Sequence, residues 1–173
     1  MRKAYLIGLF VGCCVLLLDI LTKWTVYHSI PPISASFWGY PYGGIAIFQN
    51  FFGIEFSIVH ASNKGAAWGA LADYQTPLLI LRILLITALT GYLFIFNRQK
   101  FYVIPICLLI AGALGNVIDY FQYGVVIDMF KFVFWGYHYP VFNVADSAIT
   151  IGIVWMILAS IYHQNTHDSL SSQ

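Results

Sequence analysis

Charged residues are scarce in this chain. They make up 9% of its 173 residues, whereas soluble globular domains carry about 25%. Hydrophobic residues make up 60% and aromatic residues 18%. This composition excludes an ordinary soluble domain and indicates a membrane protein. The net charge of +1 gives no electrostatic basis for binding nucleic acid or an acidic partner.

Cysteine and metal-binding patterns are also sparse. The three cysteines, Cys13, Cys14 and Cys107, lie inside apolar runs and have neither the spacing of a disulfide framework nor that of a zinc site. His163 and His167 are four residues apart, but they occupy a polar tail without a carboxylate ligand pattern. We therefore expect no metal ion and no cofactor. Serine chemistry is disfavoured as well, because nothing like a nucleophile elbow follows His60.

The chain does contain four long apolar segments, at about residues 4–24, 77–96, 101–118 and 144–162. Each approaches the roughly 20 residues that a helix needs to cross a bilayer. We expect an α-helical polytopic membrane protein that forms a single membrane-embedded domain over residues 1–173. Its outer loops are expected at about 28–76 and 119–143.

The basic residues predict the orientation of these segments. Arg2 and Lys3 precede the first segment, and Arg98 and Lys100 occupy the turn between the second and third. The positive-inside rule places both sites, and therefore both termini, in the cytoplasm. No small-residue cleavage site follows the first apolar run, so we expect that run to remain as the first helix.

One outer loop changes its hydrophobic period. Residues 53–58 alternate between apolar and polar side chains, which is typical of a half-buried strand. Open strands cannot lie in lipid, so we expect a small β-sheet on the outer membrane face.

Several polar residues lie in or beside the apolar segments. A carboxylate at membrane depth costs several kcal/mol and by default marks a function. Local explanations exist: an acid and a base four residues apart form an intrahelical ion pair, and an Asn three residues before an Asp can cap a helix. Most of these groups are nevertheless expected at the same depth, near the outer face of the membrane, which favours a joint role. The polar residues are Asp19, Lys23, Asn116, Asp119, Asp128, Asn143 and Asp146.

Two aspartates in contact can hydrolyse a peptide bond. They share one proton, so the ionised member activates water while the protonated member polarises the carbonyl. The residues alone leave open whether Asp119 or Asp128 is the partner of Asp146. Two other classes also stay open: a small proton- or ion-coupled transporter, whose carboxylates are expected near the membrane midplane, and a lipid-binding scaffold.

Five short motifs occur in an order that closely resembles the lipoprotein signal peptidases (type II signal peptidases, aspartyl protease family A8). The resemblance implies a four-helix bacterial inner-membrane endopeptidase, with a small extracytoplasmic sheet and a short amphipathic helix. It also implies cleavage of diacylglyceryl-modified prolipoproteins just before the modified cysteine, with membrane lipid as a second partner. The motifs are Asp19-x-x-Thr22-Lys23, Asn63-x-Gly65-Ala66-Ala67, Gly115-Asn116-x-x-Asp119, Val126-x-Asp128 and Phe142-Asn143-x-Ala145-Asp146.

The same resemblance implies roles for individual residues. The catalytic pair is Asp128 and Asp146, and the supporting and substrate-binding residues are Asp19, Lys23, Asn63, Gly65, Asn116, Asp119, Asn143 and Ala145. One position departs from the family pattern, because Tyr120 follows Asp119 where an arginine is usual. We expect Arg82 or Lys131 to supply the missing positive charge beside Asp119.

Overall fold

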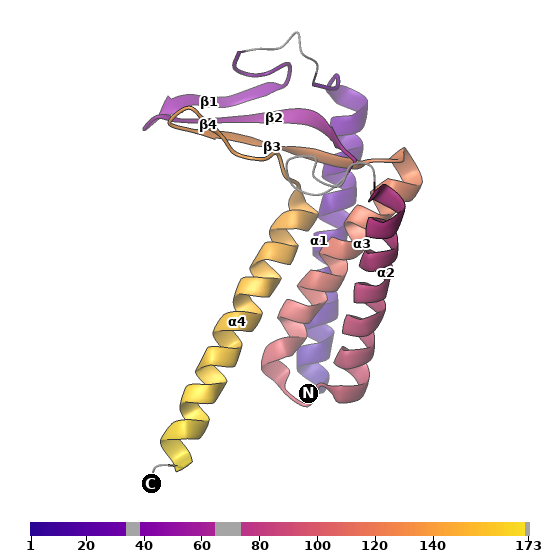
Figure 1. Ribbon diagram of the computed structural model, residues 1–173, viewed down its shortest axis with the longest axis vertical. Helices are drawn as coiled ribbons and strands as arrows, with labels where there is room; N and C mark the ends of the chain where they lie inside the picture. Colours follow the sequence, from indigo (N-terminus) through magenta and orange to yellow (C-terminus); the bar gives the residue numbers. More distant parts are fainter. Residues whose placement is uncertain (34–38, 65–73, 172–173) are drawn as a thin grey trace.

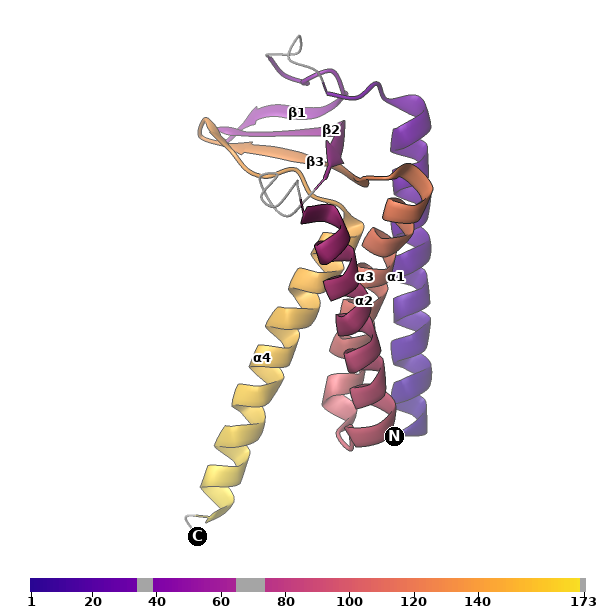
Figure 2. The same cartoon turned by 45° about the vertical axis from the view of Figure 1, so that its right-hand side comes forward.

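The computed structural model describes residues 1–33, 39–64 and 74–171, and gives no side-chain description beyond residue 162. Four helices are long and apolar enough to cross a membrane, as expected from the sequence (Figure 1). Three of them lie together, whereas the fourth diverges from the others toward the C-terminus (Figures 1 and 2). The elements in chain order are α1 (Arg2–Ser29), β1 (Ile45–Phe51), β2 (Ile54–Asn63), α2 (Gln75–Gly91), the π-helix η3 (Tyr92–Phe96), the 3₁₀-helix η4 (Lys100–Tyr102), α3 (Val103–Tyr123), β3 (Val126–Phe134), β4 (Tyr137–His138) and α4 (Val144–Ser171).

Three helices extend beyond the apolar segments that predicted them. Helix α1 continues to Ser29, α3 to Tyr123 and α4 to Ser171. The predicted ends were placed where hydropathy falls, but the backbone hydrogen bonds that define a helix continue into the polar residues beyond. Helix α3 ends where Gly124 adopts a left-handed conformation with φ of 73°, which is the usual role of glycine after a helix.

Helix α3 is the centre of the helical part. In its most apolar stretch 56% of residues are buried within the protein, against 11–17% in the other three helices. Its small residues explain this position. A Cβ atom on Gly112 would meet the backbone of Ala145, and one on Gly115 would meet the carboxylate of Asp19. The glycines thus let α4 and α1 approach α3 closely.

The sheet lies across the ends of the helices, away from the N-terminus (Figures 1 and 2). Its strands run antiparallel in the order β1-β2-β3-β4. The strand expected at 53–58 is confirmed as β2, which continues to Asn63, while β1, β3 and β4 were not predicted as strands. A separate short amphipathic helix is not found within the described ranges.

Pairing between β2 and β3 brings distant polar residues together. Ala61 lies opposite Asp128, and Asn63 lies opposite Val126. Strand β3 follows α3 after a short turn, so its first residues lie directly above the helix ends. The sheet therefore carries Asp128 to the place where α1, α3 and α4 meet.

Candidate active site

Lys23 is the fully buried centre of a charged cluster beneath the sheet. Its side chain is 1% exposed. Its Nζ lies 2.7 Å from Oδ2 of Asp19 and 2.9 Å from Oδ2 of Asp119, and it donates a 3.0 Å hydrogen bond to Oδ1 of Asn116. One ammonium group thus joins α1 to α3.

Asp19 extends this cluster to the fourth helix. Its Oδ1 accepts a 2.8 Å hydrogen bond from the backbone N–H of Ala145 in the first turn of α4. The intrahelical Asp19–Lys23 pair expected from the sequence is therefore present, but it also contributes to packing. A buried pair of charges needs such additional hydrogen bonds to be tolerated.

The expected partner of Asp119 was wrong. Asp119 pairs with Lys23, whereas the ammonium of Lys131 lies 4.5 Å from the ring centroid of Tyr42. Arg82 lines a small cavity together with Tyr120. The sequence did not reveal the Lys23 partner because the two residues lie on different helices, and only their packing brings them together.

Asp119 also holds the start of β3. Its Oδ2 accepts a 3.0 Å hydrogen bond from the backbone N–H of Ile127, the residue before Asp128. This backbone contact was missed from the sequence, because it depends on how the strand folds back over α3. It makes Asp119 a positioning group for its neighbour in the site.

Asp128 is 2% exposed and accepts two amide hydrogen bonds. Asn143 Nδ2 donates to its Oδ1 at 2.7 Å, and Asn63 Nδ2 donates to its Oδ2 at 3.0 Å. The first donor stands at the start of α4 and the second at the end of β2. Both carboxylate oxygens are therefore held in fixed directions.

Asp146 occupies the first turn of α4 and is less buried than Asp128. Its Oδ1 accepts a 2.9 Å hydrogen bond from Asn116 Nδ2, and its Oδ2 a longer one of 3.4 Å from the backbone N–H of Asn143. The backbone N–H of Asp146 in turn donates to Oδ1 of Asn143 at 2.8 Å. This reciprocal arrangement is that of a capping box, so the predicted cap is confirmed.

Two asparagines connect the aspartates. Asn143 Nδ2 donates to Oδ1 of Asn116 at 3.2 Å as well as to Asp128, and Asn116 donates to Asp146. Asp128 and Asp146 are thus joined through two side-chain amides. The network fixes the orientation of both amides, because Asn116 Oδ1 can only accept from Lys23 and Asn143.

The environment of Asp128 favours its protonated form. Burial raises the pKa of Asp128 to about 7, and the negative charge of Asp146 acts in the same direction. The amide of Asn63, the charge of Lys23 and the amide of Asn143 lower that pKa but do not cancel the effect of burial. Near neutral pH the site can therefore hold one protonated and one ionised carboxyl group.

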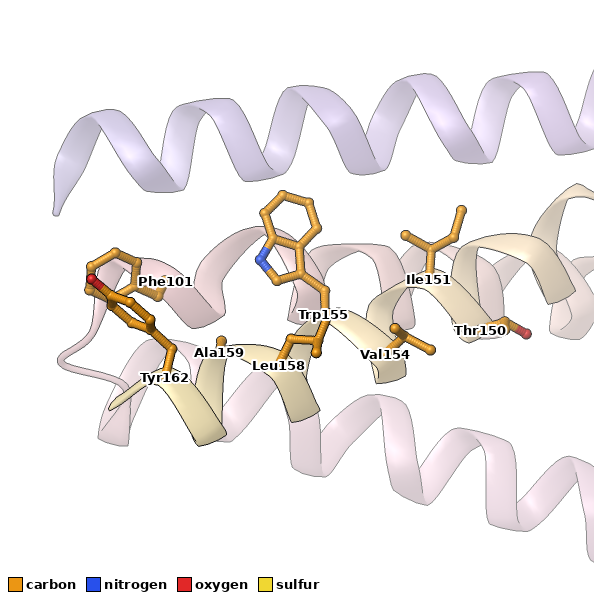
Figure 3. Close-up of a pocket in the computed structure, with 8 residues that line it drawn as sticks. All are labelled: Phe101, Thr150, Ile151, Val154, Trp155, Leu158, Ala159 and Tyr162. Atoms are coloured by element: carbon orange, nitrogen blue, oxygen red, sulfur yellow. The ribbon is translucent and has the colours of Figure 1, made fainter. Parts of the chain in front are cut away.

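An apolar groove begins one helical turn from Asp146. Its volume is about 760 Å³, within the range of about 300–1,000 Å³ typical of ligand sites. Thr150, whose hydroxyl donates to the backbone oxygen of Asp146 at 2.9 Å, stands at one end, and Tyr162 and Phe101 stand at the other (Figure 3). Between them, Ile151, Val154 and Trp155 point away from the axis of α4.

The structure brings together nearly all residues that the sequence singled out. Among the side chains described, those of residues 1–33, 39–64 and 74–162, no group of three or more His, Cys, Asp or Glu is arranged to hold a metal ion. Gly65 lies outside the described residues. The others converge where the helices meet β3, namely Asp19, Lys23, Asn63, Asn116, Asp119, Asp128, Asn143, Ala145 and Asp146.

Comparisons with known proteins agree with this geometry. Lipoprotein signal peptidases of Staphylococcus aureus strains JH9 and Newman are each 37% identical over 163 residues, which is 92% of this chain and 91% of theirs. A bacterial membrane enzyme solved by the in meso method at 2.3 Å resolution superposes with a TM-score of 0.77 at 30% identity, over 92% of this chain and 90% of that one. A second, solved at 1.9 Å, gives 0.72 at 32% identity, over 88% and 90%. The family model described as signal peptidase (SPase) II matches residues 11–162, and the chain belongs to that family.

Proposed function

We propose that this protein removes signal peptides from prolipoproteins, with Asp128 and Asp146 as its catalytic dyad. Membership of the signal peptidase II family makes it a protease. The observation that supports the dyad is the amide network, in which Asn116 and Asn143 join the two carboxylates. Asp19 and Asp119 are instead both paired with Lys23, and that pairing makes them structural supports.

We assign the shared proton to Asp128. Asp128 is the more buried of the two, and its pKa is raised to about 7. Asp146 accepts a 2.9 Å hydrogen bond from Asn116 and stands in the first turn of α4, so we assign the role of the base to Asp146. The ionised carboxylate then takes a proton from water as the water oxygen attacks the scissile carbonyl carbon. The carboxyl proton of Asp128 goes to the carbonyl oxygen, so the intermediate carries no separated charge.

The groove beside α4 gives a place for the lipid of the substrate. It begins at Thr150, one helical turn from Asp146, and the lining named above is apolar between its ends. A diacylglyceryl chain seated there would hold the neighbouring peptide bond beside the dyad, which is catalysis by proximity. We therefore propose that cleavage occurs just before the lipid-modified cysteine and depends on prior lipidation.

The charge distribution supports an orientation in a bacterial inner membrane. Arg2, Lys3, Arg98 and Lys100 lie at the end of the helices remote from the sheet. By the positive-inside rule, this end faces the cytoplasm. The sheet and the dyad then face outward, where signal peptides emerge. The gathering of the carboxylates at this end rather than at the midplane is unlike the arrangement expected for an ion-coupled transporter.

The dyad is tested by isosteric substitution. Asp128→Asn and Asp146→Asn should each abolish cleavage of a lipidated precursor in detergent, read by gel shift, because an amide can serve neither as base nor as shared-proton partner. Glu55→Gln is the matched control. Glu55 accepts a 2.6 Å hydrogen bond from Tyr42 on the sheet, outside the cluster, so this variant should retain activity. Substantial cleavage by either aspartate variant would exclude the dyad, and equal cleavage of an unlipidated precursor would exclude the lipid requirement alone.

A further inference from the structure

A second apolar groove begins at the end of the helices remote from the dyad and runs along α1 from Arg2 to Leu16. It has a volume of about 320 Å³, again in the range of about 300–1,000 Å³ typical of ligand sites. Helix α3 forms its floor, with Cys107 and Ala111. Its walls come from α1, with Cys13, and from the end of α2 and the following η3, with Thr90 and Leu93. The groove exists because α1 and α2 both pack against α3 and contact each other little.

Hydrogen bonds fix the mouth of this groove. The hydroxyl of Tyr5 donates to the backbone oxygen of Leu93 at 2.8 Å and, more weakly, to that of Asn97 at 3.4 Å. Both acceptors belong to or follow η3, the π-helical turn that ends the second membrane span. Such turns leave carbonyl groups without their usual helical donor and are frequent at functional sites. The Tyr5 ring also stacks on Phe94, with centroids 5.9 Å apart.

The mouth is positively charged. Arg2 lines it directly, and Lys3, Arg98 and Lys100 stand at the same end of the helices. Neither of the two ion pairs found among the described residues involves any of these four cations. The acidic side chains that the structure describes all lie at the sheet end; they are Asp19, Glu55, Asp119, Asp128 and Asp146.

The length of the groove matches one leaflet. It runs along α1 from Arg2 to Leu16, which is about 21 Å at 1.5 Å per residue. One leaflet contributes about 15 Å of hydrocarbon, half of the usual 30 Å core, and the head groups lie beyond it. A phospholipid with one acyl chain in the groove would therefore have its phosphate group beside Arg2.

We propose that this groove binds one anionic phospholipid from the leaflet remote from the dyad. One acyl chain lies between α1 and α2, and the phosphate contacts Arg2. Basic pockets between membrane helices are the usual sites for anionic head groups. The lipid would fill the space that α1 and α2 leave over α3, and so support the bundle from the side opposite the substrate.

Native mass spectrometry of the full chain tests this proposal. The probes are dioleoylphosphatidylglycerol and dioleoylphosphatidylcholine, which share acyl chains and differ in net charge. We expect one retained phosphatidylglycerol that phosphatidylcholine displaces poorly. Arg2→Gln should weaken this binding about fivefold, the effect of one cation near an anionic head group. Lys3→Gln is the control, because Lys3 does not line the groove.

Two adjacent cysteines provide the second test. Cys13 and Cys14 are both exposed, but only Cys13 lines the groove. Cys13→Trp should fill the groove and abolish the retained lipid, whereas Cys14→Trp should leave it. Cleavage of the lipidated precursor should persist in both variants, which verifies the fold. Equal retention of the two lipids, or equal loss in the two tryptophan variants, would overturn the proposal.

Discussion

The ammonium group of Lys23 lies 2.9 Å from the carboxylate of Asp119 and joins α1 to α3 beneath the sheet. The same group contacts Asp19 and Asn116. Asp19 then reaches the first turn of α4, and Asn116 reaches Asp146. One buried cation thus connects α1, α3 and, through Asp19, α4. It reaches Asp146, one member of the proposed dyad, through Asn116.

Removing this cation should destabilise the protein. Lys23→Met would leave two buried carboxylates without their counter-charge, which costs about 3–5 kcal/mol. Thermal unfolding in detergent should show a markedly lower Tm for this variant. Lys131→Met is the comparison, because Lys131 lies over the ring of Tyr42 and not beside Asp119. An equally large loss in both variants would mean that Lys23 has no special role in the cluster.

Close packing around Gly115 should be equally sensitive. A methyl group there would meet the Asp19 carboxylate and the side chain of Ala145, so we expect Gly115→Ala to destabilise the protein by about 1–3 kcal/mol, as overpacking does. Gly91→Ala is the matched control, since its added Cβ meets nothing within 4 Å. That variant should keep the wild-type Tm or exceed it slightly, because alanine favours helix. A neutral Gly115→Ala variant would contradict the tight contact between α1 and α3.

The spans were predictable from the sequence, whereas the sheet was only partly so. Long apolar runs leave a helix as the simplest structure that satisfies the backbone in lipid. Strand β2 was recognised from its alternation, but β3 (Val126–Phe134) reads as a mostly apolar run whose first four residues are all buried. Periodicity does not distinguish such a strand from a short helix. Its identity as a strand is established by its pairing with β2 and β4.

Which residues belong to the site was likewise predictable, but how they pair with one another was not. Polar groups at membrane depth signalled a function, and the family resemblance named the residues. Their partners were not predictable, because Lys23 reaches Asp119 by helix packing and Asn63 reaches Asp128 by strand pairing. Lys131 and Arg82 were proposed as partners of Asp119 because they are cations expected on the outer side of the membrane. Lys23 was not considered for this role because it belongs to the first apolar segment.

The pH dependence of cleavage should report on Asp128. Its pKa is raised to about 7 by burial and by Asp146, and the proposed mechanism needs its proton. Raising the pH removes that proton, so kcat for a lipidated precursor should fall above about pH 7. Well above the pKa, on the alkaline limb of the plot of kcat against pH, the fall should be about tenfold per pH unit. The measurement is kcat between pH 5.5 and 9. A rate that rises through this range would mean that Asp128 is the base.

Replacing Asn63 should shift the pH at which kcat begins to fall. Its amide N–H donates to the Asp128 carboxylate and lowers the pKa of that group. Asn63→Ala removes the donor, so the pKa of Asp128 should rise further and the alkaline limb should shift to higher pH. Gln49→Ala, an exposed change on β1, should leave the limb in place. A limb unmoved in Asn63→Ala would separate Asp128 from the observed titration.

The groove beside α4 should control the use of the lipid on the substrate. Val154 lines the groove and points away from the helix axis (Figure 3), whereas the adjacent Ile153 is similarly exposed without lining it. Val154→Trp would occupy space intended for an acyl chain, so KM for the lipidated precursor should rise with little change in kcat, the pattern of lost ground-state binding.

Ile153→Trp places the same ring on another face of α4, where it contacts bulk lipid, and both constants should stay near wild type. Because the two variants differ only in which face carries the ring, a general effect of tryptophan on insertion would affect them equally. Steady-state cleavage in detergent, with Tm measured on the same samples, separates the two outcomes. Equal KM values for Val154→Trp and Ile153→Trp would place the acyl chains of the substrate elsewhere.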